Sequence, residues 1–298
     1  MKRWSTPTGG ILLALAGATA FSGKAIIVKL SYRYGVDAVT VIMYRMLMAL
    51  PFFLAMSWWA SRSTHALANP LGRRDAWAIA GLGFLGYYLA SFLDFLGLQT
   101  ITASLERLIL YLNPTLVLLL SWLVYKHPIQ ARRAWAMAVS YGGVLVVFAH
   151  EMSFSGEGVV TGSVFVLASA LSYALYLMFS GQMVKRVGAL RLVGWASSVA
   201  CVCCLVQFAI LKPLSAALVP TPVLWLALLN ATACTVAPVL LVMLAIERIG
   251  AALTSQVGMV GPMATLVLGV LVLGEPLNMW IGLGTVLVLG GVYMASQT

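Results

Sequence analysis

Long runs of apolar residues, separated by short polar segments, follow one another along the whole chain. Most of them extend over about 20 residues, the length that an α-helix needs to cross a hydrocarbon layer roughly 30 Å thick. The pattern predicts an all-α integral membrane protein with ten transmembrane helices, near residues 8–31, 37–60, 76–97, 100–125, 132–149, 159–182, 190–211, 223–244, 250–273 and 277–295.

The fourth of these helices has a counterpart later in the chain. Ala103–Pro128 returns as Ala251–Pro276 after a uniform shift of 148 residues, which lays Pro114 over Pro262. A proline inside a helix removes a backbone hydrogen bond and leaves the carbonyl four residues earlier without its usual partner. We therefore predict a helix break at each proline. Paired interruptions in two halves of a membrane protein point to a transporter's binding site.

The repeat also predicts the domain organisation. Residues 1–150 and 151–298 each contain five predicted helices. Because five is odd, the second set enters the membrane from the opposite side, and the two are expected to be inverted copies. The freed carbonyls of Leu110 and Gly258 would then approach the membrane midplane from opposite sides. The first helix resembles a secretory signal peptide, but its counterpart near 162–188 indicates that it is retained as a membrane helix.

Composition and charge support a membrane location. The chain is 62% hydrophobic and only 9% charged, whereas soluble domains have about 25% charged residues. The net charge of +10 does not indicate nucleic-acid binding, because the basic residues lie in short loops. With the N-terminus inside, twelve Lys and Arg residues fall on the cytoplasmic side and three on the other, Lys29, Arg33 and Lys212. This positive-inside bias predicts a multi-pass protein of a bacterial-type inner membrane with both termini cytoplasmic.

Two apparent cofactor motifs do not support a cofactor. Gly81–Gly86 matches the dinucleotide fingerprint GxGxxG but lies inside an apolar helix, where small residues favour close helix packing. Cys201, Cys203 and Cys204 lie at spacings that point them in different directions on a helix, so they are expected to be packing residues and not metal ligands. We expect neither a metal nor a cofactor.

Five ionisable residues interrupt the apolar runs: Lys24, Arg45, Asp94, Glu106 and Arg107. A charge at the centre of a membrane helix costs roughly 2.5–3.5 kcal/mol even on insertion scales, so such residues usually face a cavity or one another. The predicted topology places all five in the same half of the bilayer. They form either a gate or charge cluster that meets the substrate, or a structural ion-pair network that tethers the helices.

Polar side chains at helical spacing predict the lining of a cavity. Glu106 shares a helix face with Asn113, while Arg107 shares one with Tyr111. Interhelical hydrogen bonding is the alternative explanation for such residues. The predicted substrate-binding residues are Tyr87, Tyr88, Glu106, Tyr111, Asn113, Tyr173, Tyr176, Asn230, Ser255 and Gln256.

Two five-helix repeats, each with a fourth helix broken by a proline, together with the ending GPMATLVLGVLVLGEPL, resemble the EamA family of the drug/metabolite transporter superfamily. The first repeat departs from the family pattern, since Lys126-His127 replaces Gly-Glu. The resemblance implies a ten-helix exporter of amino acids or related metabolites that works by alternating access, with Glu275 as a structural residue. The YddG-type aromatic amino-acid exporters are the expected subgroup.

We therefore predict a secondary transporter with a small-molecule substrate, the lipid bilayer as its surroundings and no nucleic-acid partner, for which a monomer suffices. A broad-specificity transporter of drugs, cations or nucleotide-sugar-like metabolites is the alternative, and a channel is a third. An intramembrane enzyme is disfavoured, because His65, His127 and His150 fall at helix ends or in loops and no acidic pair shares a helix face.

Overall fold

The computed structural model describes residues 7–63, 69–126, 131–155, 158–258 and 260–296, and every regular element in these ranges is helical. The elements are α1 (Pro7–Tyr32), α2 (Ala38–Ser61), α4 (Arg73–Gly83), η2 (Phe84–Leu89), α5 (Ala90–Gly97), α6 (Ala103–Leu110), α7 (Asn113–Tyr125), α8 (Ala131–Ser155), α9 (Gly158–Val187), α10 (Ala189–Leu211), η3 (Leu214–Ala217), α11 (Thr221–Ala231), η4 (Thr232–Val236), α12 (Ala237–Gly258), α13 (Gly261–Leu268), η5 (Gly269–Leu273) and α14 (Met279–Ser296).

Within the described ranges, eight helical spans are long and apolar enough to cross a membrane. Two shorter apolar helices, Gly261–Leu273 and Met279–Met294, complete the C-terminal part. The all-helical prediction is confirmed at this level. α4, η2 and α5 form one such span, Arg73–Gly97, although a π-helical segment interrupts its α-helical hydrogen bonding.

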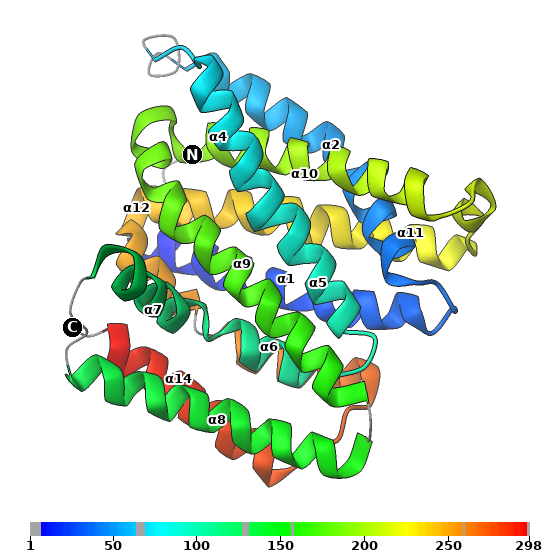
Figure 1. Ribbon diagram of the computed structural model, residues 1–298, viewed down its shortest axis with the longest axis vertical. Coiled ribbons are helices and arrows are strands. Elements are labelled where there is room, and N and C mark those ends of the chain that lie inside the picture. Colours follow the sequence, from blue (N-terminus) through cyan, green and yellow to red (C-terminus); the bar gives the residue numbers. More distant parts are fainter. Residues whose placement is uncertain (1–6, 64–68, 127–130, 156–157, 259, 297–298) are drawn as a thin grey trace.

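The helices pack as pairs from distant parts of the chain (Figure 1). α2 lies along α10, α1 along α12, and α8 along α14, while α9 packs against α5 and η2. α8 and α14 lie together at one side of the molecule, and α2 and α10 lie toward the opposite side (Figure 1). The broken helices α6 and α13 contact each other between these outer pairs.

The pair of α2 and α10 is tied together at one end by Asp37. Its carboxylate caps α2 by accepting from the backbone N–H of Val39 at 3.0 Å and forms an ion pair with Lys212 at 3.1 Å. Partial burial raises the pKa of Asp37, but hydrogen bonds from Thr40 and Lys212 outweigh it, so the net pKa lies below its ordinary value. The carboxylate is therefore ionised at neutral pH and holds the two helix ends together.

Backbone irregularities recur at the 148-residue shift that relates the sequence repeats. The π-helical segments η2 and η4 begin at Phe84 and Thr232, which are 148 residues apart. The turn between α6 and α7 corresponds to the end of α12 and start of α13, and each following helix has its proline in the first turn. Lys126 and Gly274 close the following helices in the left-handed conformation, with φ of 57° and 72°. The two halves thus share these departures from α-helical geometry, whereas the π-helical η5 has no counterpart in α7.

One predicted boundary is wrong. The eighth and ninth helices were expected to be separated between residues 244 and 250, but α12 continues through this region to Gly258. In the first half the corresponding segment is a turn, after which Thr102 caps α6 by accepting from the N–H of Leu105 at 3.1 Å. Residues 245–249 of the second half contain neither proline nor glycine and favour a helix. Gly250 stands where Thr102 would be, so the side-chain cap is missing.

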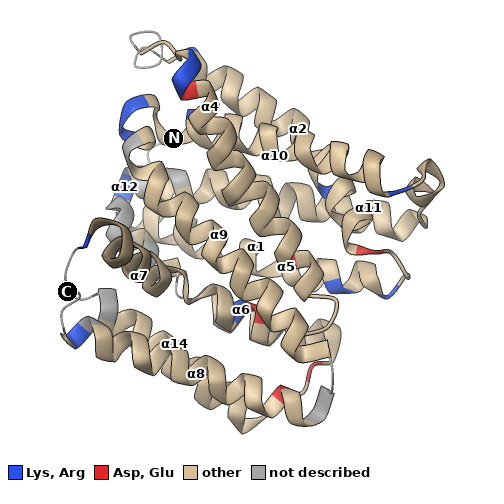
Figure 2. Ribbon diagram, viewed as in Figure 1, with Lys and Arg blue, Asp and Glu red and all other residues tan. Residues whose placement is uncertain are grey.

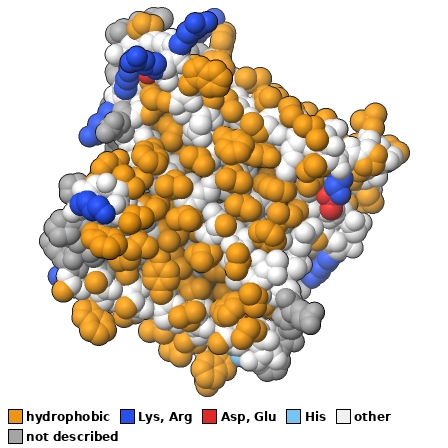
Figure 3. Space-filling view, in the orientation of Figure 1, with side chains coloured by type: hydrophobic (Ala, Val, Ile, Leu, Met, Phe, Trp, Pro, Cys, Tyr) orange, Lys and Arg blue, Asp and Glu red, His pale blue; other side chains and the backbone are white. Residues whose placement is uncertain are grey.

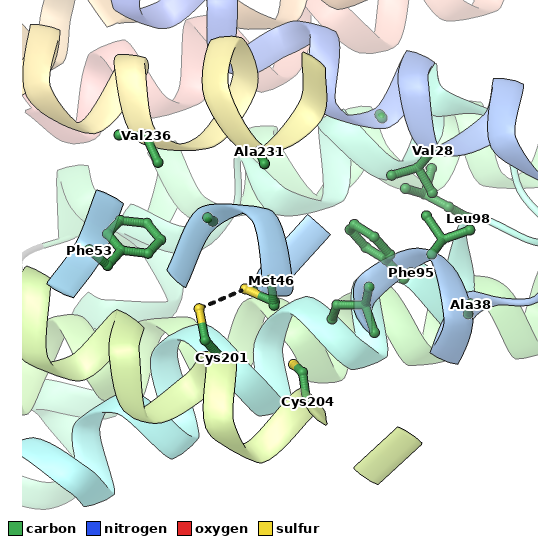
Figure 4. Close-up of a cluster of buried hydrophobic side chains, with 14 of the residues drawn as sticks. Val28, Ala38, Met46, Phe53, Phe95, Leu98, Cys201, Cys204, Ala231 and Val236 are labelled. Atoms are coloured by element: carbon green, nitrogen blue, oxygen red, sulfur yellow. Dashed lines mark hydrogen bonds between the residues drawn. The ribbon is translucent and has the colours of Figure 1, made fainter. Parts of the chain in front are cut away.

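The largest buried cluster lies between α1, α2, α5 and α10 (Figure 4). Phe53, Phe95 and Leu98 are almost fully buried there. Cys201 and Cys204 are fully buried in the same cluster, and the Cys201 sulfur lies 3.7 Å from that of Met46. As expected from the sequence, these cysteines act as packing residues.

The outer surface is apolar over the middle of the helices. Leu145, Val202 and Val286, near the middle of α8, α10 and α14, are 63%, 52% and 68% exposed. Hydrophobic side chains cover most of the face shown in Figure 3, and charged side chains gather near its margins (Figures 2 and 3). A continuous exposed apolar surface of this extent requires an apolar environment, which a bilayer supplies.

The left-handed helix end at Lys126 yields a first prediction. A side chain in this conformation costs about 1 kcal/mol, which glycine avoids. We expect Lys126→Gly to raise the thermal midpoint of the purified protein in detergent, and Gly274→Ala, at the matching position, to lower it. A lower midpoint for Lys126→Gly would contradict this interpretation.

The close contact between α8 and α14 yields a second prediction. α8 and α14 run antiparallel, and a Cβ atom added to Gly291 would lie 2.5 Å from the carbonyl oxygen of Ala136 and even closer to the Ser140 hydroxyl. We expect Gly291→Ala to destabilise the protein by about 1–3 kcal/mol through overpacking. Gly290→Ala is the matched control, because a Cβ at Gly290 meets nothing within 4 Å. Equal midpoints in a detergent thermal melt would refute the close contact.

Candidate functional site: an amphiphilic cavity at the helix breaks

A cavity of about 620 Å³ lies among the irregular elements of the fold. Its wall takes residues from α1, α2, η2, α5, α9, α10, η4 and α12, and from the helix ends that flank both breaks. Of the predicted site residues, the wall includes Lys24, Arg45, Tyr87, Asp94, Arg107, Tyr111, Asn113, Pro114 and Tyr173.

Tyr111 joins the two helix breaks across the cavity. Its hydroxyl donates to the backbone carbonyl of Gly258 at 2.5 Å. This is the carbonyl that Pro262 was expected to free, so the broken helix of the second half supplies an acceptor to the break of the first. Ser22 of α1 donates to the nearby carbonyl of Gly261 at 2.8 Å. At the second break, the Tyr111 hydroxyl thus takes the place of the helical N–H that Pro262 lacks.

Lys24 is the centre of the buried charges. Its ammonium lies 2.5 Å from Asp94 and 3.3 Å from Glu106, and it connects α1 to α5 and α6. The Lys24 and Asp94 side chains are 8% and 2% exposed, and that of Glu106 is fully buried. One cation therefore serves two carboxylates. This contact favours the structural reading for these three residues, although Lys24 and Asp94 also reach the cavity wall.

Arg107 holds the same region from the other side of α6. Its Nε donates to the Thr265 hydroxyl at 2.9 Å and its Nη2 donates to the Phe21 carbonyl at 3.1 Å. The guanidinium also lies 5.6 Å from the centre of the Phe21 ring. Arg107 thereby joins α6 to α13 and α1.

Arg45 of α2 is the least occupied of the cations. Its Nε donates to the Thr235 hydroxyl at 3.0 Å, and its guanidinium carbon lies 5.2 Å from the Phe95 ring. The Nη1 atom is buried and has no hydrogen-bond partner in the described part of the chain. Oδ1 of Asp94 and both carboxylate oxygens of Glu106 are likewise buried without a hydrogen bond.

Aromatic rings form another part of the site. The Tyr87 and Tyr176 hydroxyls lie 3.1 Å apart, and their rings meet edge to face at 5.1 Å. Tyr173 stacks on Tyr176 at 5.5 Å. The Tyr176 ring occupies the space that a side chain on Gly86 would need, so the glycine of η2 permits this approach. Tyr87 and Tyr173 face the cavity, with Tyr176 packed behind them.

Several predicted site residues lie off the cavity wall. Glu106 is buried behind it and Tyr88 stacks on Phe92. Asn230 is 1% exposed, and its side-chain oxygen has no hydrogen-bond partner among the described residues. Pro262 is buried in the first turn of α13. The side chains of Ser255 and Gln256 lie outside the part of the structure that is described, so their proposed role stays a prediction.

Other wall residues were not singled out from the sequence. They are the aromatic and polar side chains of Phe21, Phe53, Ser197 and Thr235. Phe21 and Phe53 look like lipid-facing residues in an apolar run, and no sequence signal separates them from their neighbours. Thr235 lies in η4, 148 residues after Tyr87 of η2, so an alignment of the two halves points to it.

The start of α6 is capped by two carboxylates, one from α8 and one from the segment between η5 and α14. Glu275 accepts from the N–H of Ala103 at 2.8 Å and from the Ser104 hydroxyl at 2.8 Å. Glu151 accepts from the Thr102 hydroxyl and from its N–H at 3.4 Å. Negative charge at a helix N-terminus is stabilising. The structure thus gives Glu275 the structural role that the resemblance implied.

Comparison with known proteins agrees with this architecture. The EamA-like transporter family matches residues 8–149 and again 160–297. The chain belongs to the EamA-like transporter family. It is 30% identical to the uncharacterized transporter YcbK of Bacillus subtilis (strain 168) over 293 residues, which cover 95% of this chain and 90% of YcbK.

More distant similarities extend the same picture. The uncharacterized transporter YoaV of the same organism is 23% identical over 74% of this chain and 73% of its own length. A solved crystal structure, 16% identical over 97% of both chains, has a TM-score of 0.63, which shows a shared fold. Family and helices together indicate a multi-pass membrane protein that acts as a transporter and not as an enzyme. In the described part of the chain, no three His, Cys, Asp or Glu residues are grouped to hold a metal.

The shared ion pair yields a third prediction. Lys24→Met would leave Asp94 and Glu106 buried without their common cation, which typically costs about 3–5 kcal/mol. We expect a large fall in the yield of monodisperse protein and in its thermal midpoint. Adding Asp94→Asn to this variant removes one uncompensated charge and is expected to restore part of the loss. Additive destabilisation in the double variant would show that the three groups are not coupled.

Proposed function

We propose that this protein is a secondary transporter that exports amino acids, aromatic ones included, or related small metabolites across a bacterial-type inner membrane by alternating access. The observation that carries the proposal is the cavity at the two helix breaks, which combines aromatic and apolar walls with buried cations. Its volume of about 620 Å³ falls in the range of roughly 300–1,000 Å³ that is typical of small-molecule sites.

The proposed topology has ten membrane helices in two inverted repeats, residues 1–150 and 151–298, with both termini cytoplasmic. It is supported by the irregularities 148 residues apart and by the pairing of α8 with α14. In that pair the Ser140 hydroxyl lies 3.5 Å from the Val288 carbonyl, again 148 residues along. A contact between repeat-equivalent residues is expected where a two-fold axis relates the halves.

In this mechanism the halves rock about a substrate held between them. α6 and α13, the short helices beside the breaks, belong to different halves and contact each other. Residues from both halves line the cavity, among them Tyr87 and Thr235. Because one chain supplies lining residues from both halves, we propose that a monomer suffices for transport.

Counterflow in proteoliposomes tests the proposal. Vesicles loaded with an unlabelled amino acid are expected to accumulate the same labelled compound transiently and with saturable rates. The panel holds aromatic, aliphatic and polar amino acids together with cationic drugs. Saturable exchange of drugs alone would favour the broad-specificity alternative, non-saturating flux would indicate a channel, and an inert protein would refute transport of these compounds.

Glu106 provides a fourth prediction. Its carboxylate shares Lys24 with Asp94, so we expect Glu106→Gln to slow counterflow by altering the charge balance beside the cavity while folded yield is preserved. Asp37→Asn is the control, because it also replaces a carboxylate by an amide but lies outside the cavity wall and keeps a good helix cap. Wild-type rates in Glu106→Gln would remove Glu106 from the transport machinery.

A further inference from the structure

We infer that the cavity selects molecules that carry a carboxylate and an apolar body, and that Arg45 is the group that holds the carboxylate. The inference rests on the proposed function for the identity of the site. It goes further, because it names the chemical group that the substrate must carry, a carboxylate, and the residue that binds this group, Arg45.

The first argument is the balance of charge. Lys24, Arg45 and Arg107 are three cations, whereas Asp94 and Glu106 are the two carboxylates buried beside them. Both carboxylates are taken by Lys24. In the described part of the chain, neither arginine has a carboxylate oxygen within 4.0 Å of its nitrogens. One positive charge remains uncompensated, and it belongs to the arginines on the wall.

The second argument separates the two arginines. Arg107 donates to Thr265 and to the Phe21 carbonyl, so two of its nitrogens are engaged in joining helices. Within the part of the chain that the structure describes, Arg45 makes a single hydrogen bond, through Nε to Thr235, and its Nη1 is buried and unpartnered. A buried charged donor without an acceptor is costly. A ligand that brings an acceptor to Arg45 removes that cost.

Arginine also has the right shape for this task. Its planar fork can place two N–H groups on one carboxylate, which a lysine ammonium cannot match in geometry. The Phe95 ring beside the guanidinium and the hydrogen bond to Thr235 limit the rotation of the Arg45 fork. Arg45 is thus partly oriented before a ligand arrives.

The other residues of the wall indicate the chemical character of the rest of the ligand. Phe21, Phe53, Tyr87, Tyr173 and Leu177 offer apolar and aromatic surface. A molecule with a carboxylate and a hydrophobic body fits both parts of the cavity. A molecule whose only charge is positive would meet the uncompensated positive charge, which disfavours cationic drugs.

Binding to the purified protein tests the inference without requiring transport. Three probes share a phenyl ring: hydrocinnamate carries only a carboxylate, phenethylamine only an ammonium, and phenylalanine both. We expect hydrocinnamate and phenylalanine to raise the thermal midpoint in a saturable manner, and phenethylamine to leave it unchanged. Isocaproate, isoamylamine and leucine form a second series that controls for the choice of ring.

Two variants and a control assign the effect to Arg45. Arg45→Gln is expected to weaken hydrocinnamate binding by roughly 10- to 100-fold, the usual effect of losing a charged hydrogen bond. Arg45→Lys keeps the charge but loses the fork, so an intermediate affinity is expected. Arg62→Gln is the matched control, since Arg62 ends the same helix, is exposed and lies over Trp58. It should bind as the wild type does.

The outcomes distinguish this inference from the proposed function. Binding of the amines as tightly as the carboxylates, unchanged hydrocinnamate affinity in Arg45→Gln, or no binding of any carboxylate would each overturn it. If Arg45→Gln does not fold, Arg45→Lys and the wild-type selectivity still decide. If carboxylates bind but no counterflow occurs, the proposed transport is refuted and the inference about Arg45 is not. If amines show counterflow as fast as carboxylates do, the carboxylate requirement is refuted and transport is not.

Discussion

Lys24 is the side chain on which the centre of this protein depends. It lies where α1 meets α5 and α6, and it supplies the positive charge that lets two carboxylates stay inside an apolar bundle. Because both carboxylates use the same cation, the position of each depends on the other. Because both carboxylates pair with Lys24, the nearby arginines contact hydroxyls, a carbonyl and aromatic rings instead. The electrostatic character of the cavity follows from this single sharing arrangement.

The backbone around the cavity departs from α-helical geometry at matching positions in both halves of the chain. Prolines end one helix and start the next, π-helical segments shift the faces of two others, and all of these features recur 148 residues apart. Residues of these irregular segments line the cavity, among them Tyr87 in η2, Thr235 in η4 and Tyr111 at the first break. The cavity therefore forms where helical hydrogen bonding is incomplete.

Much of this arrangement is readable from the sequence. Pro114 and Pro262 predict the breaks, because proline cannot continue the hydrogen-bond ladder, and charges in apolar runs predict a buried cluster because each needs a partner. The sequence could not show that Glu106 lies behind the wall while Arg107 reaches it, since neighbouring residues on a helix differ by about 100° and only packing decides which turns inward.

Other features depend on contacts that no periodicity encodes. Phe21 and Phe53 reach the cavity, although residues of the same kind elsewhere face lipid. The continuation of α12 past residue 245 was missed because the repeat suggested a turn that the helix-favouring residues of the second half do not form. Repeat symmetry is a guide to the scaffold, and local propensity decides where the halves differ.

The Glu275 cap on α6 has a consequence for the energetics of the molecule. It links the end of η5 in the second half to the start of α6 in the first, and the position 148 residues earlier is His127, which has no carboxylate to offer in return. This carboxylate cap is therefore present at only one of the two repeat-equivalent positions. In the proposed alternating-access cycle, a motion that exchanges the roles of the halves would break this one-sided contact, so the two end states would differ in free energy even with the cavity empty.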